Sequence, residues 1–193
     1  MNTDPIYSFA FRGLLTLNAL EKTSCIKKRT FTAQEGQEII NSLGINELDE
    51  DLVKTARKMA IVYTGVSAFE NTVRKFVANV LLENHGENWW ELKVTEGIKK
   101  KAESRRLEES KIRWHTPRGD SIINYTEFGD LFIVIKNNWI DFQPYIISQE
   151  WAEQIIRTIE RSRNVIMHSG ELVDQDIERI GMFIRDWIKQ VGA

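Results

Sequence analysis

The sequence predicts an all-helical protein. Its 193 residues include only three Pro and eleven Gly, so long helices can continue without interruption. Apolar residues recur three and four positions apart along most of the chain, which is the spacing of a helix that buries one face. No two segments alternate apolar and polar residues as a pair of strands would, and no internal repeat or low-complexity segment occurs. A chain of this length can bury a core without disulfides or metals.

The first part of the chain shows two helical patterns. Residues 6–20 carry apolar side chains at helical spacing, although the aromatic residues at the start of this stretch also fit an extended segment. Thr32 and Glu35 have the spacing of a capping box, which predicts a short helix that Gly44 ends.

The rest of the chain predicts one long helix followed by several shorter ones. Asp49, Ser148 and Asp174 stand directly before runs of helical spacing, where N-cap residues are preferred. The expected elements are a long helix from Asp49 to about Asn84, a Trp-rich loop at ENWWEL, a charged helix from about Thr95 to Arg113, a short apolar helix between aromatic residues within 121–145, and helices at 149–168 and 174–190. We therefore expect an N-terminal helical extension at residues 1–48 and a helical domain at residues 49–193.

Several classes of protein are disfavoured by what the sequence lacks. The single cysteine, Cys25, rules out an internal disulfide and suggests a reducing compartment. The N-terminus lacks the basic and apolar regions of a signal peptide, and no apolar run approaches the roughly 20 residues of a membrane span. No Gly-rich phosphate loop, His-Glu-x-x-His motif or Cys pair is present, so we expect no metal and no cofactor. The expected location is cytoplasmic, without a membrane partner.

Basic residues are concentrated in one segment. Residues 99–118 contain eight Lys or Arg and three Glu, a local charge of +5 in a chain whose net charge is −2. Such a segment on an acidic body can hold the phosphates of RNA, but a solvated helix face with interleaved Glu explains the pattern equally well. The candidate RNA-binding residues are Lys99, Lys100, Lys101, Arg105, Arg113 and Trp114. Trp114 is the one tryptophan that we expect to contact RNA, whereas Trp139, Trp151 and Trp187 fit the core.

The helix expected at residues 149–168 carries an arginine on its apolar face. That face consists of Ala152, Ile156, Ile159 and Ile166, which lie within about 40° of one direction on an ideal helical wheel. Arg163 lies at about 20° from the same direction and is therefore inside the face. Because burying an unpaired guanidinium is very costly, we expect Arg163 to meet an acceptor or a water-filled cleft.

Asn164 and His168 complete an Arg-Asn-x-x-x-His motif at the end of this helix. His168 lies about 140° around the helix from Arg163, so the two side chains do not share a face. Asn164 and His168 do share one, being one turn apart. Ser169-Gly170 suggests that the helix unwinds and could swing His168 back toward Arg163, and a second copy of the helix could also bring both residue types to one cleft. In an ordinary helix end, His168 would simply be favoured by the helix dipole.

These residues resemble a known signature. Arg163-Asn164-x-x-x-His168 is similar to the Arg-polar-x-x-x-His motif of the HEPN superfamily, whose all-helical domains commonly act as metal-independent endoribonucleases. The segment NYTEFGDLFIVIKNNWIDF resembles the central block of the HEPN branch that is also found on a eukaryotic RNA-surveillance endoribonuclease. Its Tyr-x-x-Phe-Gly-Asp-Leu and Asn-Trp-x-x-Phe patterns occupy Tyr125–Leu131 and Asn138–Phe142. The resemblance covers about residues 50–190 and implies a HEPN-like helical bundle.

The resemblance also implies a catalytic set. Glu70 looks like the acidic residue that faces the motif from an early helix in many members. Arg163 would bind phosphate oxygens, His168 would transfer protons, and Asn164 would hold the imidazole or the phosphate. In HEPN enzymes two such motifs usually meet across a homodimer. The 2′-hydroxyl of the RNA is then the nucleophile, and the products carry a 2′,3′-cyclic phosphate and a 5′-hydroxyl.

A toxin or phage-defence effector with RNA as its substrate is the leading hypothesis, and an antitoxin or other regulatory partner is compatible with it. HEPN toxins that are silenced by nucleotidylation carry Tyr two residues after the His, where this chain has Gly170, so that form of control is not expected.

Two alternatives remain open. One is a non-catalytic HEPN module that binds RNA or a nucleotide, or only mediates dimerisation. The other is a helical adaptor that acts through residues 1–45.

Overall fold

The computed structural model describes residues 31–192 of the chain. Every regular element within these residues is an α-helix or a 3₁₀-helix, which confirms the predicted all-α class. The helix expected at residues 6–20 lies outside the described part. The chain divides between Glu50 and Asp51 into two compact units, which are described separately. The assignment of residues 1–48 as a distinct extension stays a prediction. Within the described residues, no helix has the length and apolar character needed to cross a membrane.

The first unit contains helix α2 (Ala33–Ser42) and the 3₁₀-helix η1 (Ile45–Glu47). The predicted capping box begins α2. The Thr32 hydroxyl accepts a hydrogen bond from the Glu35 amide at 3.2 Å, and the Glu35 carboxylate accepts one from the Thr32 amide at 2.8 Å. Gly44 follows the helix with a φ of 61°, a left-handed conformation that glycine adopts without steric cost. Both predicted ends of this short helix are confirmed.

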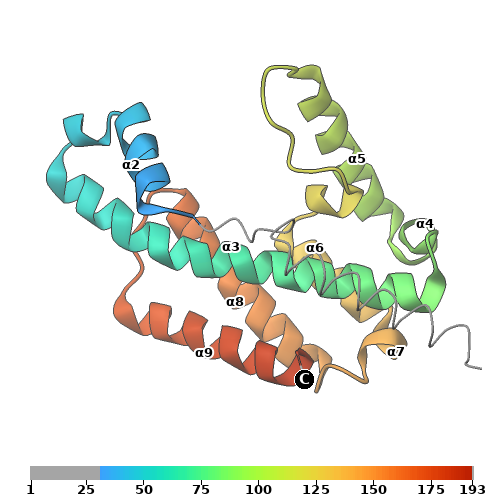
Figure 1. The fold of residues 1–193 in the computed structure, drawn as a ribbon. Helices are drawn as coiled ribbons and strands as arrows, with labels where there is room; N and C mark the ends of the chain where they lie inside the picture. Colours follow the sequence, from blue (N-terminus) through green and yellow to red (C-terminus); the bar gives the residue numbers. More distant parts are fainter. Residues whose placement is uncertain (1–30, 193) are drawn as a thin grey trace, which may run out of the picture. The chain divides into compact units, whose positions relative to one another are not determined.

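The second unit is arranged around one long helix, α3 (Glu50–His85), as Figure 1 shows. The other elements, in chain order, are α4 (Trp89–Lys93), α5 (Glu96–Lys111), η2 (Ile122–Tyr125), α6 (Phe128–Asn137), α7 (Trp139–Phe142), α8 (Gln149–Met167) and α9 (Asp174–Val191). The prediction of a Trp-rich loop at residues 87–92 is wrong, because the two tryptophans begin α4. Trp90 is buried and packs edge-to-face against Trp89, so burial of an indole stabilises this short helix.

The first residues of α8 and α9 are fixed by different interactions. The Ser148 hydroxyl accepts a hydrogen bond from the Trp151 amide at 3.2 Å, so Ser148 caps α8 as predicted. The prediction that Asp174 caps α9 is wrong, because α9 begins at Asp174 and its N-cap is Val173. The Asp174 carboxylate lies in the first turn, where the helix dipole favours it, and pairs with Lys58 of α3 at 3.1 Å.

Aromatic side chains from α3, α6, α8 and α9 meet in the core. Phe69 and Phe76 lie two turns apart on α3, and both contact Trp187 of α9 edge-to-face, at centroid distances of 5.7 and 6.0 Å. Trp151 of α8 stacks on Trp187 at 5.5 Å with the ring planes 7° apart. Phe128 of α6 contacts Phe69 edge-to-face at 6.0 Å. The predicted core positions of Trp151 and Trp187 are confirmed.

Residues 125–131 run from the end of η2 into the first turn of α6, and they join α6 to α8. Tyr125 and Phe128 are both buried. The Gly129 amide donates a hydrogen bond to the Glu160 carboxylate of α8 at 2.8 Å, and a Cβ at position 129 would lie 2.9 Å from the same oxygen. The absence of a side chain at Gly129 therefore allows this carboxylate to reach the N-terminus of α6, where a negative charge is favoured.

Arg74 attaches the same segment to α3. Its side chain is 10% exposed, and it donates to the Ile123 carbonyl at 3.1 Å, to the Thr126 carbonyl at 3.4 Å and to the Glu70 carboxylate at 2.8 Å. Buried polar groups need partners, and hydrogen bonds from an ionised donor are stronger than neutral ones. One guanidinium thus satisfies a carboxylate and two backbone carbonyls, and it fixes η2 and the start of α6 against α3.

Replacing Arg74 by Met should destabilise the protein strongly. Met is apolar and of similar length, but it removes the donor to Glu70 Oε1 and to the Thr126 carbonyl and one of the hydrogen bonds to the Ile123 carbonyl. This loss should cost about 3 kcal/mol of unfolding free energy or more. Arg157→Met is the matched control, because Arg157 is exposed and pairs with Glu153 on the surface of α8. Its cost should be about 0.5 kcal/mol or less. Urea titrations followed by circular dichroism measure both, and equal stability of the two variants would contradict the role given to Arg74.

Candidate active site

Glu70 of α3 contacts the arginine of the motif. Glu70 Oε2 lies 3.3 Å from Arg163 Nε, while Glu70 Oε1 accepts the hydrogen bond from Arg74 Nη2. The Glu70 side chain is 13% exposed and that of Arg163 is 34% exposed, so the ion pair lies at the edge of the core. The expectation that Arg163 meets an acceptor is confirmed. The acceptor is the same acidic residue that the HEPN resemblance indicated.

The outer part of the Arg163 guanidinium is left available. The contact with Glu70 is made by Nε, and neither Nη group donates a hydrogen bond to any residue between 31 and 192. A guanidinium anchored in this way still presents a planar pair of N–H donors, which matches the oxygens of a phosphate. Glu70 therefore orients Arg163 without occupying all of its donors.

Asn164 and His168 are exposed at the end of α8. The His168 amide still donates to the Asn164 carbonyl at 3.1 Å, so helical hydrogen bonding continues to this residue, and His168 is the C-cap. The expectation that unwinding swings His168 back toward Arg163 is therefore wrong. Within one chain, the structure brings Glu70 to Arg163 but shows no contact of either residue with His168.

The helix ends after His168 in a Schellman turn. The Gly170 amide donates to the Val165 carbonyl at 2.8 Å and the Ser169 amide to the Ile166 carbonyl at 3.0 Å, the two hydrogen bonds that define this turn. Ser169 adopts the left-handed conformation that the turn requires, with a φ of 61°, at a cost of about 1 kcal/mol for a residue with a Cβ. A Cβ on Gly170 would lie 2.7 Å from the Val165 side chain and 2.9 Å from its carbonyl oxygen. Position 170 thus has no room for the tyrosine of the nucleotidylated toxins.

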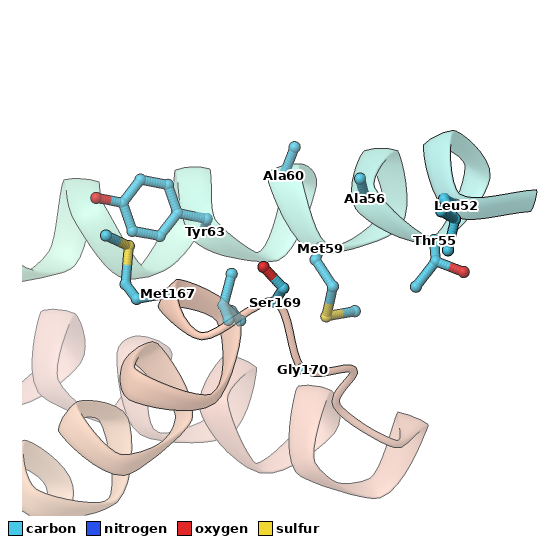
Figure 2. A pocket seen from close by; sticks show the side chains of 10 residues that line it. Leu52, Thr55, Ala56, Met59, Ala60, Tyr63, Met167, Ser169 and Gly170 are labelled. Carbon is cyan, nitrogen blue, oxygen red and sulfur yellow. The ribbon is translucent and has the colours of Figure 1, made fainter. Parts of the chain in front are cut away.

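An apolar pocket of about 540 Å³ lies between the first half of α3 and the end of α8. Its lining residues are Leu52, Thr55, Ala56, Met59, Ala60, Tyr63, Ile166, Met167, Ser169 and Gly170. Figure 2 shows the side chains of the lining, with Tyr63, Met59 and Ala60 on α3 and Met167 and Ser169 at the end of α8. None of the lining residues carries a charge. The pocket adjoins the motif, because the residues on both sides of His168 in the chain belong to its lining.

Lys99, the first residue of the basic segment, is held inside the fold. Its side chain is buried, donates to the Glu91 carboxylate at 3.3 Å and forms an ion pair with Glu96. The hydrogen bond that the Lys99 ammonium donates to Glu96 raises the pKa of Lys99 above its ordinary value against the opposing effect of burial, and the bond that it donates to Glu91 adds to the rise. Because its ammonium is already engaged, we do not include Lys99 in the RNA-binding proposal.

The other basic residues differ in how far they are available. Arg105 is partly buried, pairs with Glu127 and donates to the Tyr125 carbonyl at 2.9 Å, so it also serves the fold. The exposed candidates are Lys100, Lys101, Arg113 and Trp114. Trp114 is 86% exposed, as expected of a side chain that can stack on a base. The RNA-binding role of these four residues stays a prediction.

Two parts of the site did not emerge from the sequence alone. Arg74 carries a usable signal, because it follows Glu70 by four residues and an acid and a base at this spacing pair on a helix. The pocket has no such signal in the sequence. Its α3 residues, 52–63, show only the apolar spacing of a helix that packs against other helices. Within residues 31–192, no group of three or more His, Cys, Asp or Glu side chains could hold a metal ion.

A helical bundle in which an acidic residue of an early helix holds the arginine of an Arg-x4-His motif is a domain of the HEPN class. A family model described as Swt1-like HEPN matches residues 65–192, about two thirds of the 193 residues, and the chain belongs to this family. HEPN domains serve as ribonucleases or RNA-binding modules. The match includes Glu70 and the whole Arg163–His168 motif, whereas residues 52–63 of the pocket precede it. No match was found among curated proteins or among solved structures.

Gly170→Ala should lower the free energy of unfolding by about 1–3 kcal/mol. The added methyl group would meet the Val165 carbonyl oxygen, a backbone atom that cannot move without disrupting the last turn of α8. Gly97→Ala is the matched control, because nothing lies within 4 Å of a Cβ at that position in the first turn of α5. It should raise the unfolding free energy by up to about 1 kcal/mol through better helix propensity. Urea denaturation measures both changes, and a Gly170→Ala protein as stable as Gly97→Ala would contradict the described turn.

Proposed function

We propose that this protein is a metal-independent endoribonuclease in which Glu70, Arg163, Asn164 and His168 form the catalytic set. The ion pair between Glu70 and Arg163 is the observation that carries this proposal. The core does not require an arginine beside its apolar face, yet this chain has one, paired with Glu70 through Nε and with both Nη groups unpaired among residues 31–192. Such a pre-oriented guanidinium is suited to a phosphate whose negative charge grows in the transition state.

The proposed reaction uses the 2′-hydroxyl of the RNA itself. The 2′-oxygen forms a bond to phosphorus while the bond from phosphorus to the 5′-oxygen breaks. A base takes the proton of the 2′-hydroxyl, and an acid gives a proton to the 5′-oxygen, so the products are a 2′,3′-cyclic phosphate and a 5′-hydroxyl. Histidine titrates near neutral pH and suits both transfers, each typically worth roughly 10²- to 10⁴-fold in rate. Arg163 would neutralise the phosphorane, and Asn164 would hold the imidazole or the phosphate.

We propose that two chains complete the site. Arg163 is paired with Glu70, whereas His168 lies about 140° around an ideal helix from it, so one chain does not present both side chains to one phosphate. A two-fold related copy of α8 would bring a second motif beside the first. This arrangement supplies two histidines, one for each proton transfer.

The proposed biological role is that of a toxin or phage-defence effector in the cytoplasm, where an antitoxin or other regulatory partner would restrain cleavage. The exposed basic side chains after residue 99 would bind the RNA backbone, and Trp114 would stack on a base. Because the phosphate contacts displace counterions, RNA affinity should depend on salt.

The deciding experiment is cleavage of a defined RNA in excess EDTA, alongside the same RNA with a single 2′-deoxy nucleotide at the mapped cleavage site. The proposal expects cleavage of the first and none of the second at that site. It also expects 2′,3′-cyclic phosphate termini by mass spectrometry. Cleavage that requires a divalent metal, or that proceeds at the deoxy position, would contradict the mechanism, and binding without cleavage would favour the non-catalytic module.

His168→Ala should abolish RNA cleavage, with a loss of at least about 100-fold, because proton transfer loses its donor or acceptor. The unfolding free energy should change by about 0.5 kcal/mol or less, since the side chain is exposed. His115→Ala is the control, as His115 is also exposed but lies in the loop after α5. A large loss of stability in His168→Ala with activity retained would make His168 a structural residue.

Arg163→Lys should reduce the cleavage rate by at least about 100-fold, because a single ammonium cannot reproduce two coplanar donors. Arg161→Lys changes an exposed arginine two residues before Arg163, and this variant should cleave at the wild-type rate. Single-turnover rates with saturating RNA compare the two variants. Near wild-type cleavage by Arg163→Lys would contradict the phosphate-clamp role.

Mixing wild-type chains with an equal amount of His168→Ala chains should lower the activity of each wild-type chain to about one half, if subunits exchange freely and mixed dimers are inactive. Albumin at the same concentration serves as the control for added protein. Light scattering should show a dimer. A monomer with full cleavage, or unchanged activity after mixing, would place the whole site within one chain.

A further inference from the structure

We propose that the apolar pocket between α3 and α8 binds a nucleobase of the RNA beside the scissile phosphate and so selects the base at that position. The selection role rests on the proposed ribonuclease function, whereas the binding of a base can be tested without cleavage. A volume of about 540 Å³ falls within the usual range of small-molecule sites and exceeds what one base needs, so purines also fit.

The pocket lies within reach of a nucleotide held by the motif. Met167 and Ser169, the chain neighbours of His168, both line it, and consecutive Cα atoms are about 3.8 Å apart. Ile166, another lining residue, follows Arg163 by three positions, a rise of about 4.5 Å along the helix. A phosphate at the Arg163 fork and a base in the pocket would therefore belong to the same nucleotide or to its immediate neighbour.

The chemistry of the pocket suits a base and not a phosphate. Its lining is uncharged, so a phosphate would lose its hydration without gaining a cation. Tyr63 and Met167, which both line the pocket (Figure 2), offer a ring and a polarisable thioether for stacking. Stacking of one base on an aromatic ring is worth roughly 5- to 150-fold in affinity. The hydroxyls of Thr55 and Ser169 can bond the edge of the base.

The position of the pocket relative to the family match favours a role in selection. The motif and its turn lie inside the matched residues 65–192, whereas Tyr63 and the other α3 residues of the lining precede them. The proposed cleavage chemistry thus belongs to the matched part of the chain. The base would be chosen by the α8 residues of the lining together with a helical segment that precedes the match.

The binding test uses the four ribonucleosides as uncharged probes, in equilibrium dialysis against full-length protein. Ala60→Phe and Ala56→Phe fill the pocket from two exposed helical positions that tolerate Phe without repacking the core. Ala68→Phe makes the same change on an exposed part of α3 that does not line the pocket. Wild type and Ala68→Phe should bind at least one nucleoside equally well, and both filling variants should bind it at least tenfold more weakly.

The selection test maps cleavage sites on a randomised RNA. Wild type should prefer one class of base at a fixed position next to the cut, and Ala60→Phe should reduce that preference at least tenfold. Nucleoside binding by wild type that equals binding by the filling variants, or no binding by wild type, would overturn the proposal. A second result would also overturn the proposal. If wild type binds no nucleoside and a filling variant is monomeric in light scattering, the pocket is covered by a second copy of the chain and not by a base. Nucleoside binding without any RNA cleavage would overturn the proposed function and leave the base site in place.

Discussion

The Glu70 carboxylate connects the packing of the bundle with its candidate chemistry. One oxygen accepts a hydrogen bond from the buried Arg74, and the other faces Arg163 at 3.3 Å. One negative charge between two permanent positive charges leaves the cluster with a net charge of about +1. Desolvation at the edge of the core makes this charge act over a longer range than it would on a fully solvated surface. An anion is therefore attracted to the side of the cluster that remains open, which is the Arg163 side.

Helix α8 is fixed on two sides within a single turn. Glu160 accepts the amide of Gly129 at the start of α6, and Arg163, three residues later, pairs with Glu70 of α3. Beyond this turn the side chains of α8 are exposed except that of Ile166, and the helix ends at Met167 with His168 as its C-cap. The contacts of Glu160 and Arg163 thus set the direction of the last turn of α8. The backbone of His168 is positioned by this turn, although its side chain has no partner among the described residues.

The sequence predicted the helices well because helix formation depends on local patterns. The Thr32–Glu35 capping box, the Ser148 cap and the apolar spacing of α3 all involve residues within a few positions of one another, and all appear in the structure. Asp174 was misassigned because acidic residues are favoured both at the N-cap and in the first turn, and its partner Lys58 is remote in sequence.

The site was only partly predictable for the same reason. The wheel placed Arg163 among apolar neighbours and so required an acceptor, but the identity of Glu70 came from the family resemblance and not from spacing. Lys99 looked like its exposed neighbours until the structure showed it buried against Glu91 and Glu96. A helix pattern gives the face of a residue, whereas its partners depend on how separate helices cross.

The stacked indoles of Trp151 and Trp187 give the protein an intrinsic optical signal. Two nearly parallel indoles with centroids 5.5 Å apart couple their electronic transitions, which gives a circular dichroism band in the near ultraviolet that neither ring has alone. Trp187 also touches Phe69, the residue next to Glu70. The amplitude of this band therefore reports on the alignment of α8 and α9 against α3 near the candidate site, and it needs no label. It can also be followed in the presence of RNA, because RNA absorbs at shorter wavelengths than the red edge of the band.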